Sequence, residues 1–246
     1  MKTVISAATF AFVCLLAAAA TASDPGIRTE KVQFAKGSSS AVIKGQLKGD
    51  ATVDYKLRAG AGQTLSVQLQ KTNAQNYFNV LPPGSKDAAM YVGQTGEDYK
   101  GVLPTDGDYT IRVYLMRAAA RRNESSDYTL TIGVTGTALM ALPAAQDALI
   151  PGTRFHASAQ VACVPYIESK PRECTANVIR RGIDGTGTVE LFGTESLKRN
   201  ILFEKGKPVA SDSAEAMTST RKDDVTTVRF GTDERYEIPD VLLTGG

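Results

Sequence analysis

Strict alternation of apolar and polar residues is the feature that most constrains what this chain can fold into. Leu65, Val67 and Leu69 would lie on one face of an extended chain, with the polar residues between them on the other. The same period of two recurs in three other segments, residues 53–57, 109–115 and 128–134. This period is that of a β-strand with one buried and one solvated face. The chain is therefore predicted to be an all-β protein.

Turn signals and a change in composition divide the predicted strands into two domains. Residues 30–134 carry alternating segments separated by Gly- and Pro-rich turns, at intervals typical of an antiparallel β-sandwich. The pattern breaks over residues 135–152, where we predict a linker. Residues 153–246 are predicted to form a second, smaller β-rich domain. Its candidate strands are residues 153–164, 176–181, 186–192, 198–204, 225–230 and 235–238.

The first 22 residues have the three parts of a secretory signal peptide. Lys2 supplies the basic start, an apolar stretch follows, and the small residues Ala20-Thr21-Ala22 precede the predicted cleavage before Ser23. Every later apolar run is interrupted by charge or glycine well before the roughly 20 residues needed to cross a bilayer. The mature chain is expected to be a secreted, periplasmic protein without a membrane span.

Removal of the signal peptide leaves two cysteines, Cys163 and Cys174. Exported proteins meet an oxidising environment, and two cysteines allow a single intramolecular pairing. A redox-active pair would instead have the tight C-x-x-C spacing. We therefore predict a structural disulfide in the second domain, which contributes about 3 kcal/mol in the chain-entropy model.

The residue content limits the enzyme chemistry open to this chain. His156 is its one histidine, so a multi-histidine metal site is impossible and any Ser-His-Asp scheme must pass through it. It alternates with apolar neighbours on a predicted strand, which favours a structural histidine over a catalytic base. Motifs of metalloproteases, α/β-hydrolases and nucleotide-binding loops are absent. We expect no enzyme activity, no cofactor and no metal.

Several residue clusters that carry chemistry in other proteins are interpreted here as turns. The glycines of residues 182–187 would supply positive φ to a hairpin rather than cradle a phosphate. The Asp-Gly-Asp at residues 106–108 lacks the further carboxylates of a calcium cage, so a hairpin turn is favoured. The acidic pairs at 223–224 and 233–234 are interpreted as solvated turns rather than glycosidase carboxylates. A formal net charge of only +2 argues against a nucleic-acid partner.

The most informative stretch is an arginine-bearing connection between two alternating segments. It contains Arg117, then three alanines, then Arg121 and Arg122. A spacing of four places Arg117 and Arg121 on the same side if the segment coils into a helical turn, which gives two guanidinium forks suited to carboxylates. Composition alone favours an ordinary solvated connection between strands.

A set of motifs runs through most of residues 30–134 in one order. They are Val32 to Ala41, Gly45-x-x-Lys48-Gly49, Tyr55, Ala59-Gly60-x-Gly62-Gln63, Leu103-Pro104-x-x-Gly107-x-Tyr109-x-x-Arg112-Val113, Arg117, Ala120-Arg121 and Tyr128. This set resembles the periplasmic inhibitors of goose-type lysozyme. Part of it is also similar to the pre-peptidase C-terminal β-sandwich modules of secreted enzymes, but the arginine loop belongs to the inhibitors. The second domain resembles an uncharacterised β-domain that follows such inhibitors in proteobacteria.

The resemblance implies a β-sandwich that inhibits goose-type lysozyme by inserting a loop into its sugar-binding cleft. Arg117 and Arg121 match the family's binding arginines, and Arg122 and Asp106 complete the predicted partner-binding set. At two positions the chain departs from the family pattern. Asp106 replaces a small hydroxyl residue and Asp50 replaces an aromatic one. Both changes add negative charge, which should weaken binding to an acidic cleft.

Two other functions remain open from the sequence. A non-catalytic module that binds a cell-envelope glycan such as peptidoglycan, or another envelope protein, fits the sandwich resemblance and the added acids. A hydrolase that uses His156 or an acidic pair of the second domain is the weaker alternative, because the accompanying motifs are missing.

Overall fold

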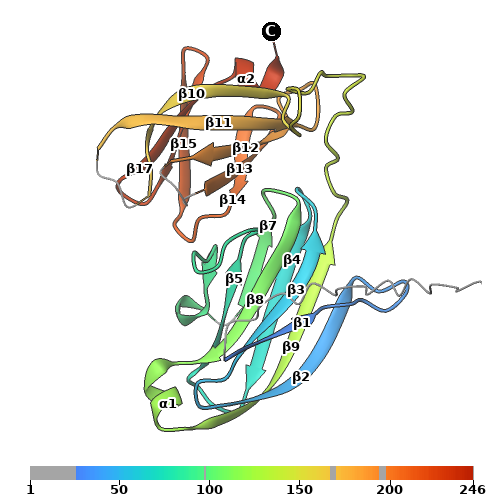
Figure 1. Cartoon of the computed structure of the whole chain (residues 1–246), viewed down its shortest axis with the longest axis vertical. Coiled ribbons are helices and arrows are strands. Elements are labelled where there is room, and N and C mark those ends of the chain that lie inside the picture. Colours follow the sequence, from blue (N-terminus) through green and yellow to red (C-terminus); the bar gives the residue numbers. More distant parts are fainter. Residues whose placement is uncertain (1–25, 97, 167–169, 194–197, 246) are drawn as a thin grey trace, which may run out of the picture.

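The computed structural model describes residues 26–96, 98–166, 170–193 and 198–245, and the predicted signal peptide lies outside these ranges. Two units of β-structure are stacked end to end (Figure 1). Within the described residues, helical structure is confined to short turns: η1 Gly93–Thr95, α1 Arg117–Arg121 and α2 Val241–Thr244. The all-β prediction is confirmed.

The first unit is a sandwich of two sheets. The first sheet has the strand order β1-β3-β8-β5-β6 and the second has the order β2-β9-β4-β7. The strands of the first sheet are β1 Ile27–Lys31, β3 Thr52–Ala59, β5 Asn76–Leu81, β6 Tyr91–Val92 and β8 Gly107–Leu115. Those of the second sheet are β2 Ser40–Lys48, β4 Thr64–Lys71, β7 Asp98–Val102 and β9 Ser125–Thr135.

The alternating residues fill the space between the two sheets as predicted. Leu65 and Val67 of β4 and Ile111 of β8 are fully buried members of one apolar cluster. Across this core, the hydroxyl oxygens of Tyr55 in β3 and Tyr128 in β9 lie 2.7 Å apart. A buried polar group needs such a partner, because burial removes its contact with water. The tyrosine pair therefore ties the sheets together without leaving a hydroxyl unsatisfied.

One pairing in the sandwich departs from the predicted antiparallel arrangement. β1 runs parallel to β3, with Ile27 beside Thr52, whereas the other strand pairs of the sandwich are antiparallel. Between them in sequence, β2 lies in the opposite sheet, so the chain crosses the sandwich and returns in the direction of β1. This crossover leaves Ile27 at the edge of the first sheet.

The second unit is an eight-stranded antiparallel sheet with the order β14-β13-β12-β11-β10-β17-β16-β15. The sheet curls into a near-barrel, and this curl brings its end strands β14 and β15 close to each other. Cys163 in β10 and Cys174 in β11 form the predicted disulfide, inside the apolar core of this unit. The strands are β10 Ala157–Val164, β11 Arg172–Arg180, β12 Gly187–Phe192, β13 Lys198–Glu204, β14 Lys207–Ser211, β15 Met217–Lys222, β16 Val225–Phe230 and β17 Glu234–Pro239.

Two of the predicted turns have different outcomes. The glycine-rich residues 182–187 join the paired strands β11 and β12, and Gly185 has a φ of +82°. The hairpin prediction is therefore confirmed there. It is wrong for residues 106–108, because the chain at this point leaves β7 in the second sheet and enters β8 in the first.

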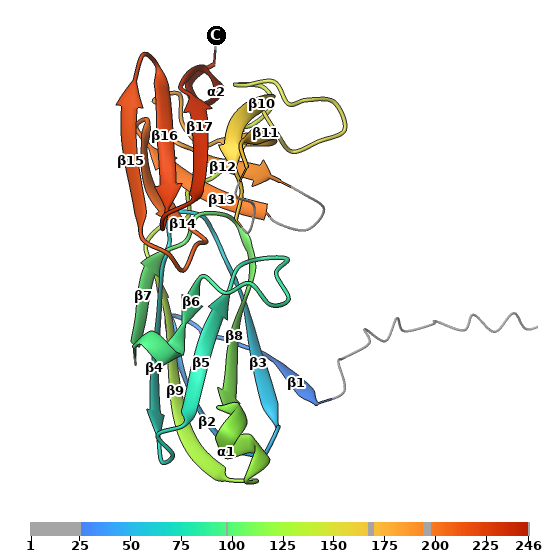
Figure 2. The same ribbon diagram turned by 90° about the vertical axis from the view of Figure 1, so that its left-hand side faces the viewer.

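The sandwich and the near-barrel are joined by residues 136–156, which run along one side of the molecule (Figure 1). Near the start of this segment, the Leu139 N–H donates to the Ala61 carbonyl at 2.9 Å. Ala61 also packs with Leu202 and Ala210 of the near-barrel in a small apolar cluster. Figure 1 and Figure 2 both place α1 at the end of the sandwich opposite to the near-barrel. In the described part of the chain, no helix is long and apolar enough to span a membrane.

Candidate functional site

The arginine-bearing connection forms one helical turn, α1, between β8 and β9. Ala119 and Ala120 are buried against the sandwich, whereas Arg117 and Arg121 are exposed. The helical turn ends at Arg121, and Asn123 follows with a φ of +54°, in the left-handed region that is common just after a helix. Burial of the alanine side therefore leaves the two arginines on the outer side of α1.

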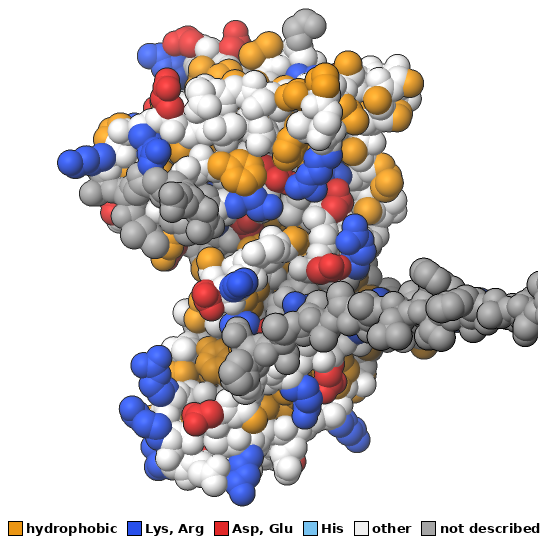
Figure 3. All heavy atoms as spheres, viewed as in Figure 1, with side chains coloured by type: hydrophobic (Ala, Val, Ile, Leu, Met, Phe, Trp, Pro, Cys, Tyr) orange, Lys and Arg blue, Asp and Glu red, His pale blue; other side chains and the backbone are white. Residues whose placement is uncertain are grey.

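The three arginines at this end have different environments. Within the described residues, the Arg117 and Arg121 guanidinium groups have no hydrogen-bond or ion-pair partner. Arg122 Nε donates to Glu124 Oε1 at 2.6 Å, and Asn73 Nδ2 donates to Glu124 Oε2 at 2.8 Å. The hydrogen bond from Asn73, followed by that from Arg122, lowers the pKa of Glu124. Lys and Arg side chains gather around this end of the sandwich (Figure 3).

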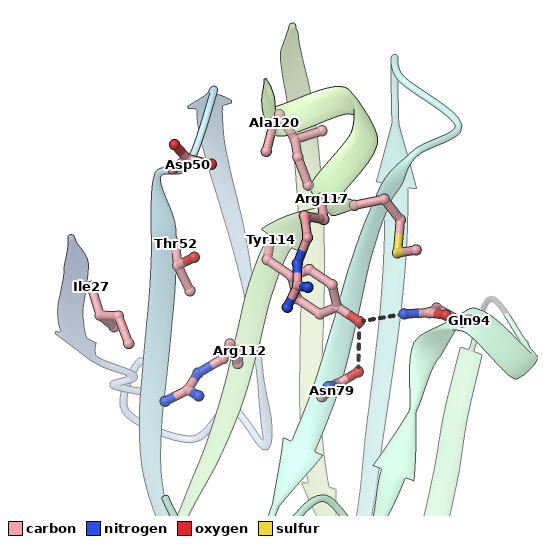
Figure 4. Close-up of a pocket in the computed structure, with 11 residues that line it drawn as sticks. Ile27, Asp50, Thr52, Asn79, Gln94, Arg112, Tyr114, Arg117 and Ala120 are labelled. Atoms are coloured by element: carbon pink, nitrogen blue, oxygen red, sulfur yellow. Dashed lines mark hydrogen bonds between the residues drawn. The ribbon is translucent and has the colours of Figure 1, made fainter. Parts of the chain in front are cut away.

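Arg117 lines an open groove of about 560 Å³ on the outer face of the first sheet (Figure 4). Residues of β1, β3, β5, β8, η1 and α1 form its floor and sides. The Arg117 side chain extends from α1 past the ring of Tyr114 into this groove. Arg121 is not a lining residue. The two free arginines therefore serve different surfaces.

A hydrogen-bond network fixes the Tyr114 ring in the groove. Its hydroxyl donates to Asn79 Oδ1 at 3.2 Å and accepts from Gln94 Nε2 at 3.4 Å. Asn79 Oδ1 also accepts from the Gly93 N–H at 3.2 Å. A Cβ on Gly93 would lie 2.1 Å from the Phe78 carbonyl oxygen, so glycine is required for η1 to approach β5 this closely. Close packing of η1 thus brings Gln94 to the tyrosine.

The other arginine of the groove, Arg112, is held by an internal carboxylate. Its Nε and Nη2 atoms donate to the two oxygens of Asp54 at 2.7 and 2.9 Å. Asp54 is only 6% exposed, so this is a bidentate pair shielded from water. Arg112 Nη1 also donates to the Lys86 carbonyl at 3.1 Å. The charge of Arg112 is therefore balanced within the sheet, unlike that of Arg117.

Asp50 lies on the rim of the same groove, in the turn between β2 and β3 (Figure 4). This turn packs against the end of α1, because the Gly49 N–H donates to the Glu124 carbonyl at 2.9 Å. Gly49 has a φ of +57°, and a Cβ there would lie 2.8 Å from Asn123 Oδ1. The charge of Asp50 thus falls at the arginine-bearing end of the sandwich.

Asp106 lies at the other end of the sandwich and is separated from the arginines of α1. Its Oδ2 accepts from Arg181 Nη2 at 2.8 Å, and its Oδ1 accepts from the Ala61 N–H at 2.9 Å. The Arg181 side chain is 0% exposed and also donates to the Leu139 carbonyl and to Thr188 Oγ1. Asp106 therefore pairs with a buried cation of the near-barrel, at the contact between the two units.

His156 has a structural environment. Its Nδ1 accepts from the Arg180 N–H at 3.0 Å, and its Nε2 lies 3.0 Å from the Leu142 carbonyl oxygen. This arrangement fits a neutral ring with its hydrogen on Nε2, donated to Leu142. The residue is 8% exposed. With both nitrogens engaged, His156 holds the segment before β10 against β11.

The two acidic pairs interpreted as solvated turns lie in different environments, and the interpretation is wrong for Glu234, which is buried at the start of β17. Glu234 accepts from Arg199 Nε and Nη2 at 2.7 and 2.9 Å and is 5% exposed. Asp223 and Asp224, both with positive φ, form the turn between β15 and β16. In the ranges that the structure describes, no cluster of three or more His, Cys, Asp or Glu residues is arranged to hold a metal.

A β-sandwich with free arginines beside an open groove has the form of a binding module. Comparisons with known proteins narrow this class. A scan against models of protein families gives no match. The inhibitor of g-type lysozyme from Escherichia coli (strain K12) is 31% identical over 125 residues, which cover 50% of this chain and 92% of the inhibitor. The chain belongs to the family of g-type, or goose-type, lysozyme inhibitors through its N-terminal half.

Solved structures of the same kind of inhibitor also match the chain. PliG of Aeromonas hydrophila, a periplasmic lysozyme inhibitor of g-type lysozyme, is 39% identical, with 44% of this chain and 97% of PliG covered and a TM-score of 0.42. PliG of Salmonella Typhimurium is 28% identical, with 44% and 98% covered and a TM-score of 0.35. The family resemblance predicted from the motifs is confirmed, and the rest of the chain is unassigned.

Proposed function

We propose that this protein is a periplasmic inhibitor that binds g-type lysozyme and blocks its substrate cleft with the α1 turn. The observation that carries the proposal is the 92% coverage of the E. coli inhibitor by this chain. The predicted signal peptide and the periplasmic location of the PliG proteins support the compartment. The protein acts by occupying the cleft and performs no chemical step.

Arg117 and Arg121 are the residues proposed to contact the enzyme. A lysozyme cleft presents carboxylates, and a guanidinium that enters a water-poor groove can form charge-assisted, bidentate hydrogen bonds with them. Neither arginine must first leave a partner within the described chain. Because Ala119 and Ala120 anchor α1 in the sandwich, little backbone freedom would be lost on binding, and the ordering cost falls on the two arginine side chains.

Arg122, Asp50 and Asp106 have different roles in this proposal. Arg122 adds positive potential, while its ion pair with Glu124 holds the end of α1 in place. Asp50 opposes the partner's carboxylates from the groove rim and reduces affinity. Asp106, paired with Arg181 at the far end, holds the near-barrel and does not contact the lysozyme.

A turbidity assay of bacterial cell lysis by g-type lysozyme tests this function. The mature protein should slow the loss of turbidity. The double variant Arg117→Ala with Arg121→Ala should weaken inhibition about 100-fold, because two charge-assisted contacts are lost. Arg58→Ala is the matched control, since Arg58 is an exposed arginine of β3 outside α1.

Two results would contradict the proposal. Undiminished lysis at a large molar excess of the mature protein would exclude inhibition. Full inhibition by the double variant would keep the function but remove the arginines from its mechanism.

A further inference from the structure

The groove beside α1 has the features of a small-molecule site, and we propose that it binds an oligosaccharide that carries one carboxylate. Its volume of about 560 Å³ lies in the ordinary range for ligand pockets. Apolar residues such as Ile27 and Met116 share its lining with charged and amide groups. This would be a second binding activity, which shares Arg117 with the proposed lysozyme contact but is measured without the enzyme.

The charges of the groove favour a ligand with a single negative charge. Arg117 extends into the groove and has no partner among the residues that the structure describes (Figure 4). Arg112 is balanced by Asp54, so it adds little net attraction. Asp50 on the opposite rim would repel a second negative charge. A carboxylate therefore fits better than a doubly charged phosphate.

The uncharged groups of the groove favour a ligand rich in hydroxyl groups. Within the described chain, the Thr52 hydroxyl and the Gln94 carbonyl oxygen make no hydrogen bond, so both remain available to a ligand. Tyr114 is held in place by Asn79 and Gln94 and offers a fixed aromatic surface. Such a ring suits the apolar face of a sugar, while the surrounding polar groups suit its hydroxyls.

The position of the groove argues against an extended peptide as the ligand. A peptide that adds to a sheet needs an unpaired strand edge. The floor of the groove is instead the face of β3, β8 and β5, where Tyr114 already stands opposite Thr52 on one side and Tyr77 on the other. The backbone N–H and C=O groups of the floor are thus already paired between strands, and a ligand must be recognised by side chains.

A matched pair of disaccharides tests the proposal by calorimetry or by NMR titration of the mature protein. N-acetylglucosaminyl-N-acetylmuramic acid carries a carboxylate, and chitobiose has a similar sugar framework without one. The acidic disaccharide should bind about tenfold more tightly, because one charge-assisted contact is gained. In Arg117→Ala this preference should disappear, whereas Arg121→Ala, outside the groove, should retain it.

A second variant separates this site from the inhibitory surface. Gln94→Ala should weaken binding of both disaccharides several-fold and leave lysozyme inhibition unchanged, because Gln94 lies on η1 rather than on α1. Absence of binding by either disaccharide would overturn the saccharide site, whatever the lysozyme assay shows. Equal affinities for the two disaccharides would overturn the role of Arg117, as would a preference that persists in Arg117→Ala.

Discussion

The two ends of the sandwich use arginine in opposite ways. At the α1 end, Arg117 and Arg121 are exposed and have no partner in the described chain. At the far end, Arg181 enters from the near-barrel with a fully buried side chain, which donates hydrogen bonds to Asp106 and Thr188. The difference shows that an arginine's role depends on its surroundings. A buried and fully paired cation joins two units, while a free one on a rigid turn remains available for recognition.

Removal of the buried cation should have the largest effect on stability. Arg181→Ala removes the hydrogen bonds of this guanidinium to Asp106, to the Leu139 carbonyl and to Thr188, so the free energy of unfolding should fall by about 4 kcal/mol. Urea denaturation of the mature protein measures this change. Arg58→Ala, at a side chain that is 76% exposed, should change stability by less than about 0.5 kcal/mol. Equal stability of the two variants would mean that Arg181 does not stabilise the contact between the sandwich and the near-barrel.

Loss of the disulfide should have the next largest effect and should be confined to the near-barrel. Cys163 and Cys174 are separated by 11 residues, so replacing both by serine should cost about 3 kcal/mol in the chain-entropy model. Thermal unfolding followed by circular dichroism measures the loss. Lysozyme inhibition at 25 °C should persist because α1 lies in the other unit. An equal loss of inhibition would show that the ends are not independent.

A change of charge at the groove rim should have a smaller effect, on binding alone. Asp50→Asn removes an exposed negative charge on the rim of the groove that Arg117 enters. Affinity for g-type lysozyme should rise about threefold at low salt, and the gain should shrink as salt screens the charges. Asp108→Asn is the control, because Asp108 is 66% exposed at the other end of the sandwich. A similar gain in this control would indicate a general charge effect.

The smallest expected effect is a pH dependence at the end of α1. Hydrogen bonds from Asn73 and Arg122 lower the pKa of Glu124 in the folded chain. A lowered folded-state pKa adds stability above the unfolded-state pKa, and this stability is lost as the pH falls through the folded-state pKa. The difference in Tm between the wild type and Glu124→Gln should therefore narrow as the pH falls from 7 to about 3. A difference that is constant with pH would argue against a role for the Glu124 charge.

Local pattern was sufficient to predict much of this fold. Alternation located the main strands of the sandwich, the two mature cysteines identified the disulfide, and the spacing of Arg117 and Arg121 anticipated the helical turn. Two strands of the near-barrel were missed for local reasons. β14 contains Pro208, and β15 is polar along nearly its whole length, so neither has the alternation by which a strand is recognised.

The site was harder to predict because its main contacts are long-range. Asp106 and Arg181 are 75 residues apart and belong to different units. The alternation of apolar and polar residues along the sequence cannot predict such a pairing. The groove has a similar origin. Tyr114, Asn79 and Gln94 come from β8, β5 and η1, and each alone has the polarity expected of a solvated position. Only the crossing of the chain between the sheets brings them together.

The near-barrel is not closed by pairing between its end strands β14 and β15, which leaves two strand edges where another chain could pair. An uncovered strand edge is a template for another chain, and natural proteins block such edges with proline or charge. Here Pro208 in β14 has no N–H to offer, and Arg221 and Lys222 end β15 with positive charge. β14 and β15, the two strands that were not predicted from the sequence, thus oppose edge-to-edge aggregation.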